Sequence, residues 1–170
     1  MRPEGSHASD NDDSAPMAQT STQPSLPEAP PYLAYGATTL RFSHVGAGDL
    51  SRGLVPFYHY RIFVADLDVG HINFRVGDTD HVNLCAGHIG YGVAEPFRGR
   101  HYAYQACRAL ASFVRAVSRR VIITADPDNS ASVRTIERLG AVFLDEIDVP
   151  ENDPHFAHGA RVKRRYLWSP

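Results

Sequence analysis

The fold is decided by the stretch Gly90–Val114, which reads "GYGVAEPFRGRHYAYQACRALASFV". An apolar, glycine-rich segment ends in the basic turn Arg98–Gly99–Arg100, and apolar residues then recur with helical spacing from Ala103 to Val117. A helix N-terminus offers unpaired N–H groups, and a glycine lets the backbone approach an anion closely. Flanking arginines add charge-assisted hydrogen bonds. The turn is therefore typical of a phosphate site, and a basic helix start without a ligand is the alternative.

Upstream of this stretch, apolar and polar residues alternate with a period of two, which indicates half-buried strands. We expect strands at residues 37–45, 57–64, 69–76 and 85–93, joined by short polar turns. Such consecutive strands favour an antiparallel meander with one apolar and one mixed face.

Downstream, the all-apolar run 121–125 predicts a strand that is covered on both faces. Asn129 and Gly140 bracket a second helix as its N-cap and its C-terminal stop. Residues 141–149 and 161–169 predict two final strands. The fold class is α/β (α+β): a mixed, mostly antiparallel sheet of six or seven strands with one parallel β-α-β crossover.

Composition divides the chain into a tail, residues 1–31, and one domain, residues 32–170. The first 31 residues hold six of the twelve prolines and almost no large apolar side chains, so burial cannot offset their ordering entropy. The formal charge of −2 gives no general attraction to nucleic acid or to anionic membranes. No apolar run approaches the roughly 18 residues that span a bilayer, and no signal core is present. We expect a cytoplasmic protein with Cys85 and Cys107 as buried thiols.

Two motifs carry a family resemblance. The pattern V-x-x-x-F-R-G-R-x-Y-A over residues 93–103 is followed, after a helix and an apolar strand, by "DNSAS" and "RLGA". Residues 70–149 thereby resemble the acetyl-CoA-binding core of the GNAT N-acyltransferase superfamily, nearest to its ribosomal-protein-alanine acetyltransferase branch. The resemblance implies an N-acetyltransferase that moves an acetyl group from acetyl-CoA to a primary amine of a small molecule, peptide or protein.

The resemblance also implies roles for individual residues. The backbone of Val93 would bind the pantetheine arm, which inserts between two strands that splay apart. Asn129 would contact the same arm, with Ser132 beside it, and helix capping is an equal alternative for Asn129. The pyrophosphate would lie on the loop of Arg98, Gly99, Arg100, His101, Tyr102 and Ala103.

The chain departs from the family pattern in the cofactor loop and at two catalytic positions. His101 replaces a usual glycine, and a side chain is tolerated there if the backbone keeps helical angles. The usual carboxylate base would fall at Cys85, Ala86 or Gly87, none of which can act as a base. Of the nearby titratable groups Asp80, His81 and His88, we select His88 as the catalytic base, with a structural histidine as the alternative. The usual tyrosine acid would fall at Ile136.

The acceptor side also differs from the family. Only residues 46–56 separate the first two strands, so the two helices usual there are shortened or absent. The uncovered polar face would carry His59, Arg61, His71, Asn73 and Arg75, with His88 beside them. A metal site on these histidines is one alternative; we expect no metal and instead an exposed face or a homodimer contact. Selectivity for the acceptor is expected in residues 150–160, which include His155 and His158. A non-catalytic acyl-CoA-binding or partner-binding module is the alternative function.

Overall fold

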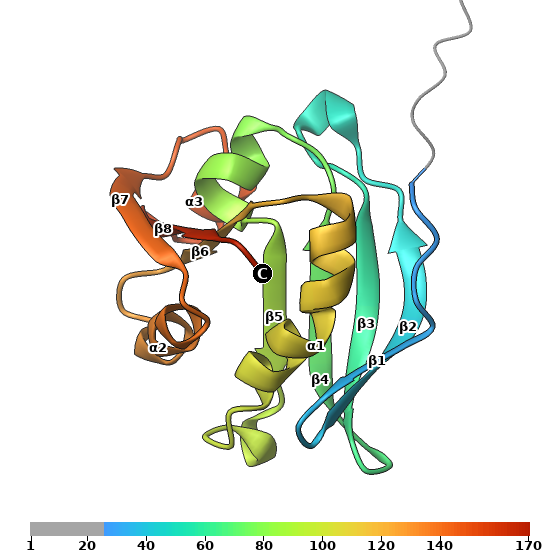
Figure 1. The fold of residues 1–170 in the computed structure, drawn as a ribbon. Coiled ribbons are helices and arrows are strands. Elements are labelled where there is room, and N and C mark those ends of the chain that lie inside the picture. The colour runs from blue at the N-terminus through green and yellow to red at the C-terminus, as the bar shows by residue number, and fades with distance from the viewer. Residues whose placement is uncertain (1–25) are drawn as a thin grey trace, which may run out of the picture.

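The computed structural model describes residues 26–170, in which a five-stranded and a three-stranded sheet meet at β5 and β6 (Figure 1). The first sheet has the order β1-β2-β3-β4-β5, all antiparallel, and the second has the order β6-β8-β7. The elements are β1 (Tyr32–Tyr35), β2 (Thr38–Gly46), β3 (Phe57–Val64), β4 (Leu67–Arg75), β5 (Ile89–Val93), α1 (Tyr102–Val117), β6 (Val121–Ala125), α2 (Ser130–Arg138), β7 (Val142–Asp148), α3 (Pro154–Ala157) and β8 (Val162–Trp168).

The predicted meander is confirmed. Alternation in β3 turns Tyr58, Tyr60 and Ile62 to the buried face, where α1 packs over the sheet (Figure 1). β1 was not predicted, because its four residues are mostly exposed and give no alternating signal. The segment between β2 and β3 holds a single 3-10 turn, Leu50–Arg52, so the family's two helices are absent from this connection.

Two predictions in the centre of the chain need correction. The strand expected from residue 85 begins only at Ile89, because His81–Ala86 forms a π-helical turn that Gly87 ends with a positive φ of 66°. The expected single sheet is divided in two. Its halves are joined at β5 and β6 by a backbone hydrogen bond from His88 N–H to Ile122 C=O, 2.7 Å.

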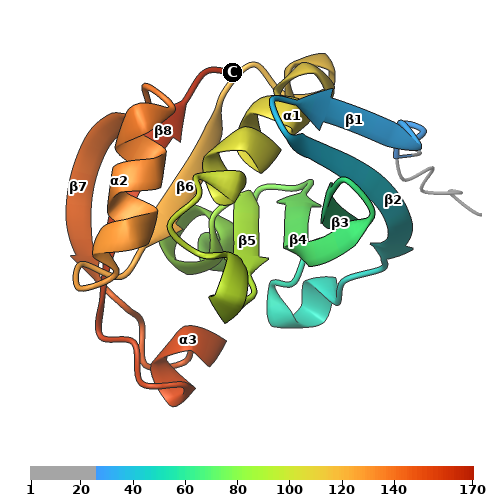
Figure 2. The same ribbon diagram turned by 90° about the horizontal axis from the view of Figure 1, so that it is seen from below.

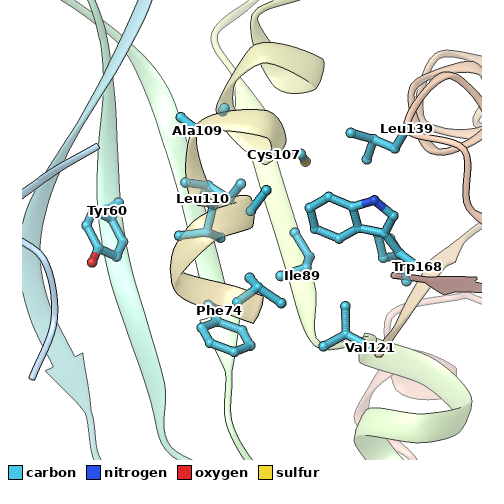
Figure 3. Close-up of a cluster of buried hydrophobic side chains, with 14 of the residues drawn as sticks. Tyr60, Phe74, Ile89, Cys107, Ala109, Leu110, Val121, Leu139 and Trp168 are labelled. Carbon is cyan, nitrogen blue, oxygen red and sulfur yellow. The ribbon is translucent and has the colours of Figure 1, made fainter. Parts of the chain in front are cut away.

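One core nevertheless spans both sheets. Figure 3 shows the Trp168 indole of β8 between Leu139 and Ile89, with Cys107 of α1 close by. Trp168 and Cys107 are fully buried, and burial raises the pKa of the Cys107 thiol to about 12. Both cysteines are free and buried, as predicted.

The chain before β1 contacts the first sheet. The hydroxyl groups of Tyr58 and Tyr60 donate hydrogen bonds to the carbonyls of Pro27 and Pro30, at 2.6 and 3.0 Å. Leu26–Pro31 therefore packs on the domain, although its composition placed it in the tail. The tail prediction for residues 1–25 lies outside the described residues. Within residues 26–170, none of the helices is long and apolar enough to cross a bilayer.

Candidate active site

The site is built on the free edge of β5. Ala94 N–H donates to Val69 C=O, and Arg75 N–H donates to His88 C=O, at 2.9 and 2.7 Å. These bonds flank the cross-strand pairs that Val93 and Ile89 form with β4. In an antiparallel ladder, residues of such pairs turn their own N–H and C=O away from the partner strand. The backbone groups of Ile89, Tyr91 and Val93 therefore face β6, with which β5 forms no ladder in residues 26–170.

A cavity of about 780 Å³ opens beside the last three residues of β5. Its walls come from β5, from the loop and first turn that begin α1, and from α2; Figure 2 looks onto this end of the molecule. The volume falls within the range of small-molecule sites. Val93, Arg98, Gly99, His101, Tyr102, Ala103, Asn129 and Ser132 line it, so the structure brings together eight of the predicted cofactor residues. Arg100 is exposed in the same loop.

The arginine–glycine loop holds two residues with left-handed backbones. Gly99 has a φ of 78° and His101 a φ of 61°. A Cβ on Gly99 would meet no atom within 4 Å, so the approach to this glycine is open. The backbone of His101 does not keep helical angles, because His101 is the left-handed residue immediately before α1. Its side chain makes no capping hydrogen bond, so the first N–H groups of α1 remain available to a ligand.

Four of the predicted cofactor residues already bond to one another, in two pairs. The Arg98 Nε–H donates to Val93 C=O at 3.0 Å, which fixes the loop against the end of β5. Asn129 Oδ1 accepts from Ser132 N–H at 3.1 Å and so caps α2. The capping role of Asn129 is confirmed, and its position on the cavity wall leaves the predicted contact with a cofactor arm open.

His88 is placed as a link between the sheets. Its Nδ1 accepts the backbone N–H of Ile122 at 3.0 Å, next to the His88 N–H to Ile122 C=O bond. An Nδ1 that accepts a hydrogen bond carries no proton, so the proton of the neutral ring lies on Nε2. Burial lowers the pKa of His88, and the residue does not line the cavity. This geometry favours the structural alternative for His88, because its Nδ1 is occupied by Ile122; the general-base role stays a prediction.

The other positions at which a catalytic residue was expected are also buried. Burial raises the pKa of the Cys85 thiol to about 12, with a further contribution from Asp153. Ile136 is fully buried. Sequence reasoning missed Tyr91, which lines the cavity, and whose pKa is raised by burial. Alternation along β5 places the Tyr91 side chain on the face of the sheet opposite to that of Gly90 and Gly92, and this pattern could have identified it.

The polar face of the first sheet carries a row of histidines on β2, β3 and β4. The rings of His44 and His59 stack at 4.9 Å, and those of His59 and His71 stack at 5.7 Å. His59 Nδ1 bonds to Asn73 Oδ1 at 2.7 Å. No cluster of three metal-ligating side chains occurs within residues 26–170. The histidines thus stack rather than converge on a metal position.

Comparison with known families identifies this arrangement. The sequence profile described as "Acetyltransferase (GNAT) domain" matches residues 10–142. The chain belongs to the GNAT acetyltransferase family. This membership confirms the resemblance, the fold class and the acetyltransferase class predicted from the sequence. A search of curated proteins gives no significant match.

Solved GNAT structures share the fold. The self-immunity acetyltransferase MccE, in complex with acetyl-CoA and AMP, aligns over 67% of this chain and 61% of its own length, with 19% identity and a TM-score of 0.51. The ribosomal α-N-protein acetyltransferase RimL, in complex with coenzyme A, aligns over 65% and 60%, with 23% identity and a TM-score of 0.51. A putative acetyltransferase aligns over 84% and 88%, with 17% identity and a TM-score of 0.59. The chain thus spans about three fifths of the length of MccE and RimL.

Proposed function

We propose that this protein is an N-acetyltransferase that uses acetyl-CoA to acetylate a primary amine. One observation carries the proposal: the backbone groups of Ile89, Tyr91 and Val93 face β6 without a ladder partner in the described chain, beside a cavity that the arginine–glycine loop closes. Unpaired strand edges bind extended chains through backbone hydrogen bonds. A pantetheine arm, with its two amide groups, is such a chain.

The residues of the cavity fit acetyl-CoA. The edge of β5 would hold the arm, and the free N–H groups of α1 would hold the pyrophosphate, with the positive charges of Arg98 and Arg100 nearby. Asn129 and Ser132 line the same cavity and would border the arm. When bound, acetyl-CoA supplies an acetyl group activated as a thioester. N–H groups of β5 that face the gap can donate to the carbonyl oxygen as negative charge develops on it.

A proline at Val93 tests the strand edge. Val93→Pro removes an N–H that faces the gap and leaves the bonds between β4 and β5 in place. We expect CoA affinity to fall about 2- to 10-fold by titration calorimetry, the value of one neutral hydrogen bond. The matched control Val93→Ala keeps the N–H and should bind CoA as the wild type does. If the wild-type protein shows no CoA binding, or if both variants bind equally, the proposed cofactor site is wrong.

The closed positions at His88 and Ile136 favour a second candidate, a domain that binds acyl-CoA without turnover. CoA binding without acetyl transfer to any amine or peptide would support it.

A cytoplasmic location and a homodimer stay predictions. The edge strand β7 exposes Val142, Phe143 and Leu144, which makes it the surface on which to test the homodimer.

A further inference from the structure

A second cavity, of about 580 Å³, lies where the connection from β7 to β8 meets the turns before β3 and β5. Figure 1 shows the green helical turn before β5 and the red-brown α3 at the upper end of β5, whereas the start of α1 lies at its lower end. Ser51, Arg52, Asp80, His81, Asn152 and Asp153 contribute its polar walls. A chain that follows the free edge of β5 from Val93 toward Ile89 runs toward the turn that carries His81.

This second cavity holds a buried histidine–aspartate pair. His81 Nδ1 lies 2.7 Å from Asp153 Oδ2, and their side chains are only 12% and 6% exposed. Asp153 Oδ1 accepts the backbone N–H of His155 at 2.8 Å, so Asp153 also caps α3. Burial raises the pKa of Asp153, but the hydrogen bonds from His81 and from the His155 N–H outweigh it and hold this pKa below its usual value. Asp153 is therefore an ionised acceptor with a fixed orientation.

The pair defines the tautomer of His81. An ionised carboxylate only accepts, so Nδ1 carries the proton that is donated to Asp153. Nε2 is then left with its lone pair, and it has no hydrogen-bond partner within residues 26–170. His88 shows the opposite arrangement, because its Nδ1 is the accepting nitrogen and is already occupied by Ile122. Of the two histidines, only His81 lines one of the two cavities.

We infer that His81 is the catalytic base for the amine acceptor and that Asp153 is its positioning residue; this inference rests on the proposed function. His81 Nε2 takes one proton from the substrate ammonium group and releases it to water. The freed amine nitrogen then forms a bond to the acetyl carbonyl carbon as the carbon–sulfur bond breaks. The second amine proton goes to the departing CoA thiolate, so the products are the amide, CoA and one proton.

Several charged and titratable groups surround this base. His155 packs against His81 with a ring separation of 5.5 Å, and burial lowers the pKa of His155, with a contribution from Lys163. Lys163 is itself paired with Asp126 at 2.6 Å. The groups around the pair are His155 from α3, Asp80 from the preceding turn, Arg52 from the 3-10 turn, and Cys85, whose thiol bonds to Asp153. Lys163 of β8 and Arg75 of β4 act on His155.

The test compares two classes of nucleophile, alkyl amines and hydroxylamine, and two histidines. Wild-type protein, His81→Gln and His44→Gln are assayed with acetyl-CoA against Ala- and Ser-starting peptides, a lysine peptide and spermidine, and against hydroxylamine, which is already unprotonated at neutral pH. We expect His81→Gln to lower transfer to alkyl amines by about 10²- to 10⁴-fold, to affect hydroxylamine far less, and to leave CoA affinity unchanged. His44 is the matched control, since it is exposed on β2 and lines neither cavity. Added imidazole should partly restore acetyl transfer to alkyl amines in His81→Ala.

A second readout is independent of turnover. Long-range ¹H–¹⁵N correlation spectra at pH 8 should show His81 as the Nδ1–H tautomer and His88 as the Nε2–H tautomer. Asp153→Asn should mix the tautomers of His81 and lower amine transfer without changing CoA affinity. An Nε2–H tautomer at His81, an unchanged rate in His81→Gln, or CoA binding without amine transfer in the wild type overturns the inference while the cofactor site stands. Absence of CoA binding instead overturns the proposed function, and the inference with it.

Discussion

The two cavities near the two ends of β5 are lined by different kinds of chemical group. Around the arginine–glycine loop, the available groups are backbone N–H groups and exposed arginines, and the strand edge contributes N–H and C=O groups. Around His81, the chemistry belongs to two buried side chains that orient each other. Backbone donors do not depend on which residue carries them, whereas proton transfer depends on one nitrogen with the right tautomer.

The difference explains where this chain tolerates change. A histidine occupies a left-handed position of the loop that glycine usually fills, yet the N–H groups of α1 remain free. At the reacting end, which is the cavity around His81, the titratable groups lie in the turn before β5 and in the segment after β7, rather than on β5 itself. At the cofactor end, which is the cavity beside the arginine–glycine loop, we expect binding to depend on backbone geometry alone.

The largest effect is expected at Gly70, where β4 and β5 approach most closely. A Cβ on Gly70 would lie 2.1 Å from the carbonyl oxygen of Gly92, and a backbone atom cannot move without displacing β5. Gly70→Ala should therefore lower the free energy of unfolding by about 3 kcal/mol or more and abolish CoA binding, measured by urea denaturation and calorimetry. In the matched variant Gly92→Ala the new Cβ meets only the His71 ring, at 2.8 Å, so the loss should be smaller. Equal losses would show that the close backbone approach is unimportant.

The next effect is expected at His88, which joins the two sheets. His88→Ala leaves the Ile122 N–H without its acceptor and should lower the free energy of unfolding by about 1–3 kcal/mol at pH 8. Amine transfer, normalised to folded protein, should stay within severalfold of the wild type. A loss of transfer as large as that of His81→Gln would instead restore His88 as the base.

The pH dependence of stability provides an independent check of the same residue. Burial lowers the pKa of His88, so the unfolded chain binds a proton more readily than the folded one. The stability that this residue contributes is complete above its unfolded pKa, near 6.5, and is lost as the pH falls through the lower folded pKa. The free energy of unfolding should therefore decrease between pH 7 and pH 5, less steeply in His88→Gln. The remaining slope belongs to His71 and His155, whose pKa values burial also lowers.

Local patterns in the sequence predicted most of the elements, because their physical causes are local. Alternation in β3, the helical spacing of α1, and the Asn129 cap all describe neighbours along the chain. The split between β5 and β6 was not predicted from the residues alone, since the pairing of strands is a long-range property; His88 and Ile122, which join the two sheets, are 34 positions apart. The positive φ of His101 was also missed, because a left-handed histidine leaves no signal in composition or periodicity.

The pair of His81 and Asp153 also could not be predicted from local sequence patterns. His81 was one of three titratable candidates near the expected base position, and His88 was selected instead. The deciding residue, Asp153, lies 72 positions away from His81 in the segment expected to govern selectivity. Only the fold brings them together, and only the hydrogen bonds assign opposite tautomers to the two histidines.

The smallest effect is expected at His101, and it tests most directly whether the backbone holds the cofactor. An L-residue in the left-handed region costs roughly 1–2 kcal/mol, which glycine avoids, although glycine also makes the unfolded chain more flexible. His101→Gly should raise the free energy of unfolding by up to about 1 kcal/mol and leave CoA affinity equal or tighter. His101→Ala removes the imidazole but keeps the strained backbone, so it should bind CoA equally without the gain in stability. If both variants lose CoA affinity by tenfold or more, the imidazole itself is a ligand, and the cofactor end relies on a side chain just as the reacting end does.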